Sequence, residues 1–246
     1  MPINYASLSL VGNRQDNQDR VEVFFSAEAA LLVAVDGMGG HAEGARAAEV
    51  TVGILRECFH GQRRPILDPQ GFLTLSLAEA HDQVVALGRG VAMDNKPRAT
   101  CAVCLVQDSA AYWAHVGDSR IYLLRAGRVH ERTRDHSHVE LLLREGLIAE
   151  RDMRSHPMRN FVECCLGGDA PLPNMSVAAR KRLVSGDVLM VCTDGLWSGV
   201  EDGEIGELSA ESEGGLTASL SWLAGRAVSR NSPHSDNTSA AALSWR

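Results

Sequence analysis

The chain has 246 residues, a length that suits one large domain or two small ones, and 45% of them are hydrophobic, as in ordinary globular proteins. Its 24 basic and 31 acidic residues give a formal net charge of −7. This charge argues against non-specific binding to nucleic acid, which depends on neutralising phosphates with Lys and Arg. No basic segment followed by an apolar one opens the chain, and the apolar stretch 21–35 is too short to span a bilayer. We therefore expect a cytoplasmic protein without a membrane segment.

The first half of the chain predicts strands on either side of two amphipathic helices. Apolar residues recur every three to four positions across 43–59 and 71–87, and the second stripe includes Phe72, Leu75 and Val84. One side of each helix needs a sheet to cover it. The strands predicted in this half are 7–11, 21–25, 31–35, 100–106, 110–116 and 120–125.

The second half begins with a less regular segment. Residues 134–173 combine a short amphipathic helix, a charged stretch and several Gly and Pro residues, which predicts an insertion, or flap, lying over the sheet. Strands resume at 176–180 and 187–193, a helix fills 214–230, and a last strand covers 239–245. Neighbouring strands joined by short turns favour antiparallel sheets, so we predict an α+β protein with a single domain over residues 1–246.

Six cysteines are present, and two of them, Cys101 and Cys104, have the spacing of a zinc ligand pair. They lie in an apolar strand, however, where positions i and i+3 face opposite sides and cannot hold one tetrahedral ion. No second pair with comparable spacing accompanies them. We therefore expect buried free thiols.

Acidic residues stand where predicted strands end. The apolar runs 31–35 and 188–193 stop at Asp36-Gly37 and Asp194-Gly195, and Asp236 precedes the closing apolar stretch. Asp-Gly marks a turn, so each run is expected to deliver a carboxylate at its end. Three such carboxylates could converge on hard divalent cations, which prefer oxygen ligands.

Six short motifs occur in a fixed order and resemble one known family. The resemblance extends from Gly12 to Leu243 and is to the PPM/PP2C-type metal-dependent protein serine/threonine phosphatases in their compact bacterial form. A single Asp-Gly pair means little, but six ordered motifs are hard to obtain by chance. The motifs are Gly12-Asn13-Arg14 with Asn17-Gln18-Asp19, Asp36-Gly37-Met38-Gly39-Gly40-His41, His115-Val116-Gly117-Asp118-Ser119-Arg120, Thr133-Arg134-Asp135-His136-Ser137, Thr193-Asp194-Gly195-Leu196 and Ser235-Asp236-Asn237-Thr238.

The resemblance implies a four-layer α-β-β-α sandwich of two antiparallel sheets flanked by helices, with two Mn²⁺ or Mg²⁺ ions at one edge. By position, Asp36 would bridge the two ions and Gly37 would offer its backbone carbonyl to one of them. Asp194 and Asp236 would complete the shell of the other ion. Asp118, together with Asp194, would match a weaker third metal site found in bacterial members.

The resemblance also implies a reaction. Phosphoserine and phosphothreonine would be hydrolysed by direct attack of a metal-activated water, since two ions can acidify a water and stabilise both the attacking and the leaving oxygen. Asp19 would orient metal-bound water, and Arg14 would bind the substrate phosphate through a planar, bidentate contact. The expected protein is monomeric, acts on phosphorylated proteins and opposes a bacterial Ser/Thr kinase. The flap is where docking specificity is expected.

Alternative functions remain open at this stage. The same fold could act on another phosphoester, or it could be a pseudophosphatase that binds phosphoproteins or senses metal without turnover. Loss of a metal-binding acid would mark a pseudophosphatase, and Asp36, Asp194 and Asp236 are all present.

Individual residues also have alternative readings. Arg14 could be a salt-bridge partner, Asp19 and Asp118 could be surface acids, His136 and His156 could be structural, and 180–182 could be a solvated basic face.

Two positions depart from the family pattern. Gln18 replaces the usual Glu, and Met38 stands where eukaryotic members have a His. The general acid is therefore open between a metal-bound water and His41.

Overall fold

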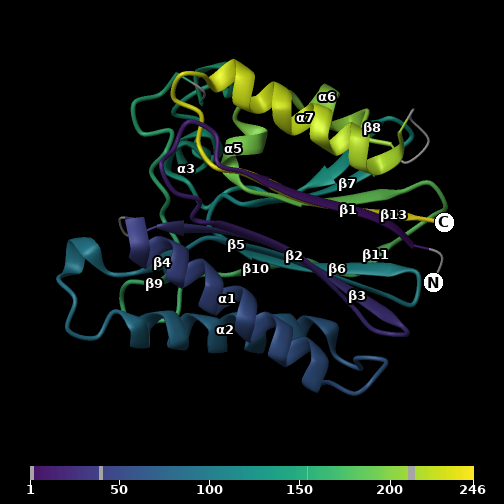
Figure 1. The fold of residues 1–246 in the computed structure, drawn as a ribbon, viewed down its shortest axis with the longest axis horizontal. Coiled ribbons are helices and arrows are strands. Elements are labelled where there is room, and N and C mark those ends of the chain that lie inside the picture. Colours follow the sequence, from purple (N-terminus) through teal and green to yellow (C-terminus); the bar gives the residue numbers. More distant parts are fainter. Residues whose placement is uncertain (1–2, 39–40, 154, 210–213) are drawn as a thin grey trace.

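Two antiparallel sheets stacked face to face form the centre of the molecule (Figure 1). The computed structural model describes residues 3–38, 41–153, 155–209 and 214–246. The first sheet has the order β1 (Ile3–Leu10), β13 (Thr238–Trp245), β12 (Val188–Cys192), β7 (Arg120–Arg125) and β8 (Arg128–Arg132). The second has the order β10 (Ser176–Val177), β6 (Ala110–Val116), β5 (Cys101–Gln107), β3 (Ala29–Met38), β4 (Arg98–Ala99) and β9 (Leu166–Gly167), with β2 (Asp19–Phe25) paired to β3 and β11 (Lys181–Arg182) paired to β6.

Helices cover both outer faces of the sandwich. Figure 1 shows α1 (His41–Gly61) and α2 (Pro69–Leu87) against the second sheet and α7 (Gly215–Asn231) against the first. The α-β-β-α architecture expected from the sequence is therefore confirmed. In the described part of the chain no helix is long and apolar enough to cross a bilayer. The short elements are η1 (Met93–Asn95), α5 (Asp194–Trp197) and α6 (Asp202–Gly206), together with α3 (His138–Arg144) and α4 (Glu150–Met153) in the flap.

The strands are apolar on both faces because each face is covered. Leu31, Val33 and Val35 of β3 pack towards α1 and α2, whereas Leu32 and Ala34 pack between the two sheets. This alternation follows the two-residue period of a strand. The buried residues form three apolar layers: one between each sheet and the helices that cover it, and one between the two sheets. A strand such as β3 contributes side chains to two of these layers, which is why its sequence is a continuous apolar run.

The cysteine prediction is confirmed. Cys101 packs in the layer under the helices and Cys104 in the layer between the sheets, so the two side chains point in opposite directions. All six cysteines are unpaired. Burial raises the pKa of Cys101 and Cys104 far above the ordinary thiol value, which makes both thiols unreactive.

The apolar stripe predicted for α2 was wrong at Leu75, whose side chain is 72% exposed. Leu73 and Leu77 face the sheet instead. A residue two positions from each of these points to the opposite side of a helix, so Leu75 meets solvent. His81 is buried on the sheet side, where its Nδ1 accepts a hydrogen bond from the Gly167 N–H at 3.1 Å.

Of the predicted strand 176–180, only Ser176–Val177 is extended as β10; β11 follows at Lys181–Arg182, and the two short strands pair with different parts of β6. In the basic cluster at 180–182, Arg180 and Arg182 are exposed, as expected for a solvated face, whereas Lys181 is half-buried. The Lys181 ammonium forms an ion pair with Glu131 and lies 5.4 Å from the centre of the Trp113 ring. Of the three side chains, that of Lys181 therefore anchors β11 at the edge of the sheet.

The start of α1 lies directly against the end of β3, and glycine is required at this contact. A Cβ added at Gly44 would lie 2.7 Å from the Gly37 carbonyl oxygen. We therefore expect Gly44→Ala to lower the free energy of unfolding by about 1–3 kcal/mol through overpacking. Gly53→Ala on the same helix is the matched control: nothing lies within 4 Å of its added Cβ, so alanine should be neutral or stabilising by up to about 1 kcal/mol. Urea unfolding of both variants measures the difference, and equal effects would contradict this reading of the contact.

Candidate active site

The pairing of the strands brings the predicted acids to one end of the sandwich. Asp19 of β2 lies directly opposite Asp36 of β3 in the register of the second sheet. In the first sheet, Cys192 at the end of β12 lies opposite Ala240 near the start of β13 and Arg120 at the start of β7. The residues just beyond these points, Asp194, Asp236 and Asp118, therefore come from the same end.

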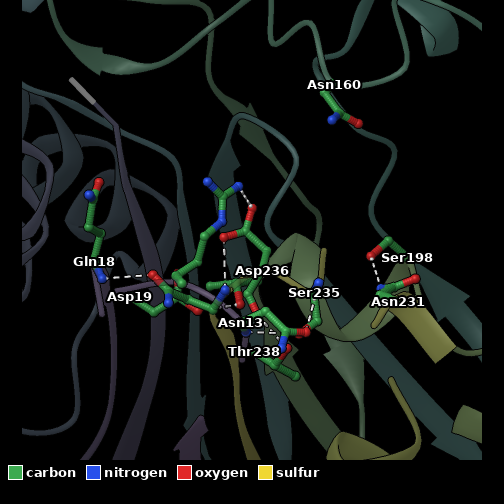
Figure 2. Close-up of polar contacts among 12 residues, drawn as sticks. Asn13, Gln18, Asp19, Asn160, Ser198, Asn231, Ser235, Asp236 and Thr238 are labelled. Atoms are coloured by element: carbon green, nitrogen blue, oxygen red, sulfur yellow. Dashed lines mark hydrogen bonds and ion pairs between the residues drawn. The ribbon is translucent and has the colours of Figure 1, made fainter. Parts of the chain in front are cut away.

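A cavity of about 490 Å³ opens at this end. It lies between the strand ends and the flap, which contributes Asn160 and Val162. In Figure 2, Asn160 stands apart from the cluster formed by Asn13, Gln18 and Asp236. The structure brings six of the seven predicted site residues to the cavity wall: Arg14, Asp36, Gly37, Asp118, Asp194 and Asp236.

Asn237 ties the two ends of the chain together at the site. Its side-chain amide donates to the carbonyl oxygens of Val11 and Asp16, both at 2.9 Å, and its Oδ1 accepts from the Gln18 N–H at 2.8 Å. These bonds hold the loop that carries Arg14 against the start of β13. Sequence reasoning gave Asn237 no role, although it stands beside Asp236 in a motif; the signal that could have found it is an amide next to a predicted ligand.

Asn13 and Ser235 make a second clamp between the same two segments (Figure 2). The Ser235 hydroxyl donates to Asn13 Oδ1 at 2.7 Å, and the Asn13 N–H donates to the Ser235 carbonyl at 3.1 Å. Because both ends of the loop are fastened, the position of the Arg14 backbone relative to Asp236 is fixed by the fold.

Asp19 and Asp118 are buried, so their reading as surface acids was wrong. Asp19 is 3% exposed and its Oδ2 accepts a hydrogen bond from the Thr193 hydroxyl at 2.8 Å. Asp118 is 5% exposed, and its Oδ1 has no hydrogen-bond partner among the described residues. A buried, unpartnered carboxylate oxygen is costly unless a cation or a proton satisfies it.

The cluster of carboxylates perturbs its own protonation. Burial, reinforced by neighbouring carboxylates, raises the pKa of Asp36 and Asp194 well above the ordinary range. Burial also raises the pKa of Asp118 to about 7 and that of Asp19 to about 6, again with help from nearby acids. Four acids that resist ionisation beside one another make a site that favours positive charge.

Arg14 supplies part of that positive charge. Its Nη2 donates to Asp236 Oδ2 at 2.7 Å, and both side chains are substantially exposed in the cavity. The salt-bridge reading of Arg14 therefore describes its contact in this structure. The pair is accessible, so a phosphate that enters the cavity can compete with Asp236 for the guanidinium.

The donor set fits hard divalent cations, since carboxylate and carbonyl oxygens line the cavity and one carboxylate oxygen is orphaned. In the part of the chain that the structure describes, no three His, Cys, Asp or Glu side chains are arranged to hold an ion by themselves. Small hard cations keep several waters and need few protein side chains, so the residues present are suitable.

His136 makes the contacts of a structural histidine, as the alternative reading proposed for it. His115 and His136 stack with ring centres 4.5 Å apart, and a ring nitrogen of His115 bonds the Arg134 carbonyl at 2.7 Å. Burial, followed by repulsion from His115, lowers the pKa of His136 to about 4, so it is neutral at pH 7. Met38 lines the cavity, and the side chain of His41 lies outside the described part of the structure.

Comparisons with known proteins agree with this geometry. The family description "Protein phosphatase 2C" matches residues 9–227. A protein phosphatase 2C-type protein of Streptococcus pyogenes is 34% identical over 195 residues, which cover 78% of each chain. The serine/threonine phosphatase stp of Listeria innocua is 30% identical and covers 79% of this chain and 78% of its own.

Solved structures of serine/threonine phosphatases also match this chain. The serine/threonine phosphatase of S. agalactiae superposes with a TM-score of 0.89 at 27% identity, over 99% of this chain and all of the other. The catalytic domain of the serine/threonine phosphatase PstP in complex with two manganese ions superposes with a TM-score of 0.80 at 26% identity, over 98% and 97% of the two chains. Together with the acid-lined cavity, these matches establish that the chain belongs to the protein phosphatase 2C family.

Proposed function

We propose that this protein is a metal-dependent phosphatase that removes phosphate from phosphoserine and phosphothreonine in other proteins. The observation that carries this function is the convergence of Asp36, Asp118, Asp194 and Asp236 with Arg14 on one cavity in a protein phosphatase 2C fold. The related serine/threonine phosphatases support the activity, and the manganese-bound PstP structure supports dependence on Mn²⁺. Mg²⁺ is a further candidate because it prefers the same oxygen ligands.

Each predicted residue has a role in this proposal. Asp36, the Gly37 carbonyl, Asp194 and Asp236 would hold two ions, and Asp118 with Asp194 would hold a weaker third. When bound, such ions supply Lewis acidity for the phosphoryl oxygens and an acidified water as nucleophile. Support for the third position comes from the orphaned Asp118 Oδ1.

Asp19 and Arg14 act around the ions. Asp19 is fixed by the Thr193 hydroxyl and lies directly opposite Asp36, where its carboxylate would accept a hydrogen bond from a metal-bound water and orient it. Arg14 would exchange its contact with Asp236 for the substrate phosphate. The guanidinium matches two phosphate oxygens at once and needs no change in the backbone, which the Asn237 and Asn13 clamps hold in place.

Arg14→Lys tests the phosphate contact. Lysine keeps the charge but not the planar pair of donors, so we expect kcat/KM for a phosphothreonine peptide to fall about tenfold or more. Steady-state kinetics measures the change, with Arg63→Lys, an exposed arginine of the segment after α1, as the control. An Arg14→Lys enzyme with unchanged kcat/KM would remove Arg14 from phosphate binding.

Removal of metal tests the reaction class. Hydrolysis of p-nitrophenyl phosphate and of a phosphothreonine peptide should require Mn²⁺, stop on addition of excess EDTA and return when Mn²⁺ is restored. Turnover that persists in EDTA would contradict the metal-dependent mechanism. Absence of turnover at any Mn²⁺ concentration would favour the pseudophosphatase, although no acid of the predicted set is missing from the chain.

We further propose that the protein opposes a Ser/Thr kinase, works as a monomer and forms one domain in which residues 134–173 are the flap. The continuous layers from β1 to β13 support the single domain. Size-exclusion chromatography with light scattering tests the monomer.

A further inference from the structure

A second cavity, of about 400 Å³, lies at the base of the flap. Three of its six lining residues are arginines, which is unusual for a chain of net charge −7. We call it the arginine pocket. Its lining residues are Arg132, Arg134, Glu140, Leu143, Arg144 and Glu150.

The flap connects this pocket to the active-site cavity. Residues 134–137 run from the pocket to the start of α3, where Ser137 forms a β-bridge with Val162. Val162 lines the active-site cavity. The His138 N–H also donates to the Phe161 carbonyl at 2.9 Å. The segment around Ser137 and Val162 therefore connects, along the flap, residues that line the arginine pocket (Arg134 and Glu140) with a residue that lines the active-site cavity (Val162).

Two guanidinium groups in the pocket have no partner. The Arg132 side chain bonds Asp202 at 3.1 Å and the Thr133 carbonyl at 3.1 Å. Among the described residues, the Arg134 and Arg144 side chains make neither an ion pair nor a hydrogen bond. The backbone of Arg134 is nevertheless fixed, because its carbonyl bonds His115. Two unpaired guanidinium groups on ordered backbone are suited to a planar or tetrahedral oxyanion.

The acidic residues of the pocket limit what it can hold. Glu140 and Glu150 reduce the formal charge of the lining to +1, which is too little for a long polyanion such as nucleic acid. A phosphate monoester is small, carries about −1.5 to −2 charges at pH 7 and offers three acceptor oxygens. It is the ligand that two adjacent arginines in a hollow of this size fit best.

We propose that the arginine pocket binds a second phosphate of the same substrate chain while the first phosphate occupies the active site. The inference rests on the proposed phosphatase function and adds a substrate class, namely proteins phosphorylated at two neighbouring sites. The connection through the flap favours a substrate phosphate, since a peptide bound in the active-site cavity can extend along the flap towards the arginine pocket. Once one phosphate is bound, the second is held close to its own site at a high effective concentration, so the substrate binds more tightly while the hydrolysis step is unchanged.

The test compares peptides with one phosphothreonine and peptides with two, at spacings of about four to ten residues, which reach about 13–35 Å when extended. We expect the wild-type enzyme to show about a tenfold lower KM for the doubly phosphorylated peptide of the matching length. The double variant Arg134→Gln/Arg144→Gln should lose this preference. The matched control, Arg56→Gln/Arg89→Gln, removes the same charge from exposed sites on α1 and after α2 and should keep it.

The outcomes separate the pocket from the proposed function. Equal KM values for both peptides in the wild type, or a preference that survives in the double variant, would overturn the second site. Absence of turnover with p-nitrophenyl phosphate and with either peptide would refute the phosphatase function itself. Inorganic phosphate distinguishes the other source of the ligand. If it changes hydrolysis of the singly phosphorylated peptide more in the wild type than in the double variant, and the wild type shows no preference for the doubly phosphorylated peptide, the pocket holds free phosphate and the substrate proposal is wrong.

Discussion

Asp36→Asn is expected to lower Mn²⁺-dependent turnover by about 1000-fold or more and, at the same time, to stabilise the metal-free protein. The loss of rate corresponds to about 4 kcal/mol of transition-state stabilisation. It is expected because Asp36 is the proposed bridge between two ions, a position that an amide fills poorly. The gain in stability follows from the surroundings of Asp36 in the metal-free fold.

Asp36 faces carboxylates from every side of the cavity. Asp19 lies directly opposite it in the β2–β3 register, and Asp194, Asp118 and Asp236 add further repulsion. Like charges directly opposite on neighbouring strands destabilise a sheet. An amide of the same shape avoids both the burial of a carboxylate and its repulsion from the neighbouring acids, and each unit by which these effects raise the pKa of Asp36 corresponds to about 1.4 kcal/mol. Loss of function and gain of stability then go together, as at other strained active sites.

Two measurements on the same variant check this prediction. Peptide dephosphorylation with Mn²⁺ gives the rate, and thermal unfolding in EDTA gives the stability. Asp82→Asn, at an exposed position on α2, is the matched control and should change neither. An active Asp36→Asn enzyme would exclude the bridging role, and a variant less stable than wild type in EDTA would show that the carboxylate makes a favourable contact in the metal-free fold.

Asp135→Asn is expected to lower the free energy of unfolding by about 3–5 kcal/mol, because it leaves the Arg120 charge buried without its partner. In the native protein, Nε and Nη2 of Arg120 donate to the two oxygens of Asp135 at 2.8 and 2.7 Å. Both side chains are less than a tenth exposed. The bidentate geometry satisfies both groups at once, so the cost of losing one of them is large.

The same substitution should also disturb the site. Arg120 lies 3.6 Å from the centre of the Trp197 ring, and the Trp197 indole N–H donates to the Asp118 carbonyl at 2.9 Å. A displaced Arg120 would therefore release a contact that holds the backbone of Asp118. We expect weaker activation by Mn²⁺ in the part of the population that remains folded.

The exposed pair between Arg132 and Asp202 supplies the control for Asp135→Asn. Its N–O distance is 3.1 Å and nearly half of the Asp202 side chain is exposed. Asp202→Asn should therefore change the unfolding free energy by no more than about 1 kcal/mol. Urea denaturation of both variants gives the comparison. Equal losses would mean that burial does not set the strength of the Arg120–Asp135 pair.

The positions of the acids could be predicted from the sequence because each one follows a local rule. An apolar run covered on both faces, such as 31–35, must be a buried strand, and the Asp-Gly after it marks the strand end. The bounds of α1, α7 and β13 followed from the same kind of periodicity to within two residues. Local signals such as apolar periodicity and turn residues identify helices and strands better than they identify contacts between distant side chains.

Contacts between distant segments could not be predicted. The Asn237 clamp joins residues more than two hundred positions apart, and the sequence gives no indication of which carbonyls it bonds. Strands β4 and β9 are two residues long and form only because they pair with each other and with β3, so they carry no periodic signal. Leu75 looks like a core residue by type, and only the orientation of α2 on the sheet shows that it is not.

The place of β13 in the first sheet has a consequence for synthesis. This strand lies between β1 and β12 and pairs with all eight residues of β1. On the ribosome, β1 is therefore made before every other strand of the two sheets and receives its neighbour only after all of those strands have been made. Asp236, two residues before the start of β13, is made immediately before that strand. A nascent chain that stops short of this point lacks both a strand inside the first sheet and a proposed metal ligand, so the proposed metal site and the first sheet are completed in the same step.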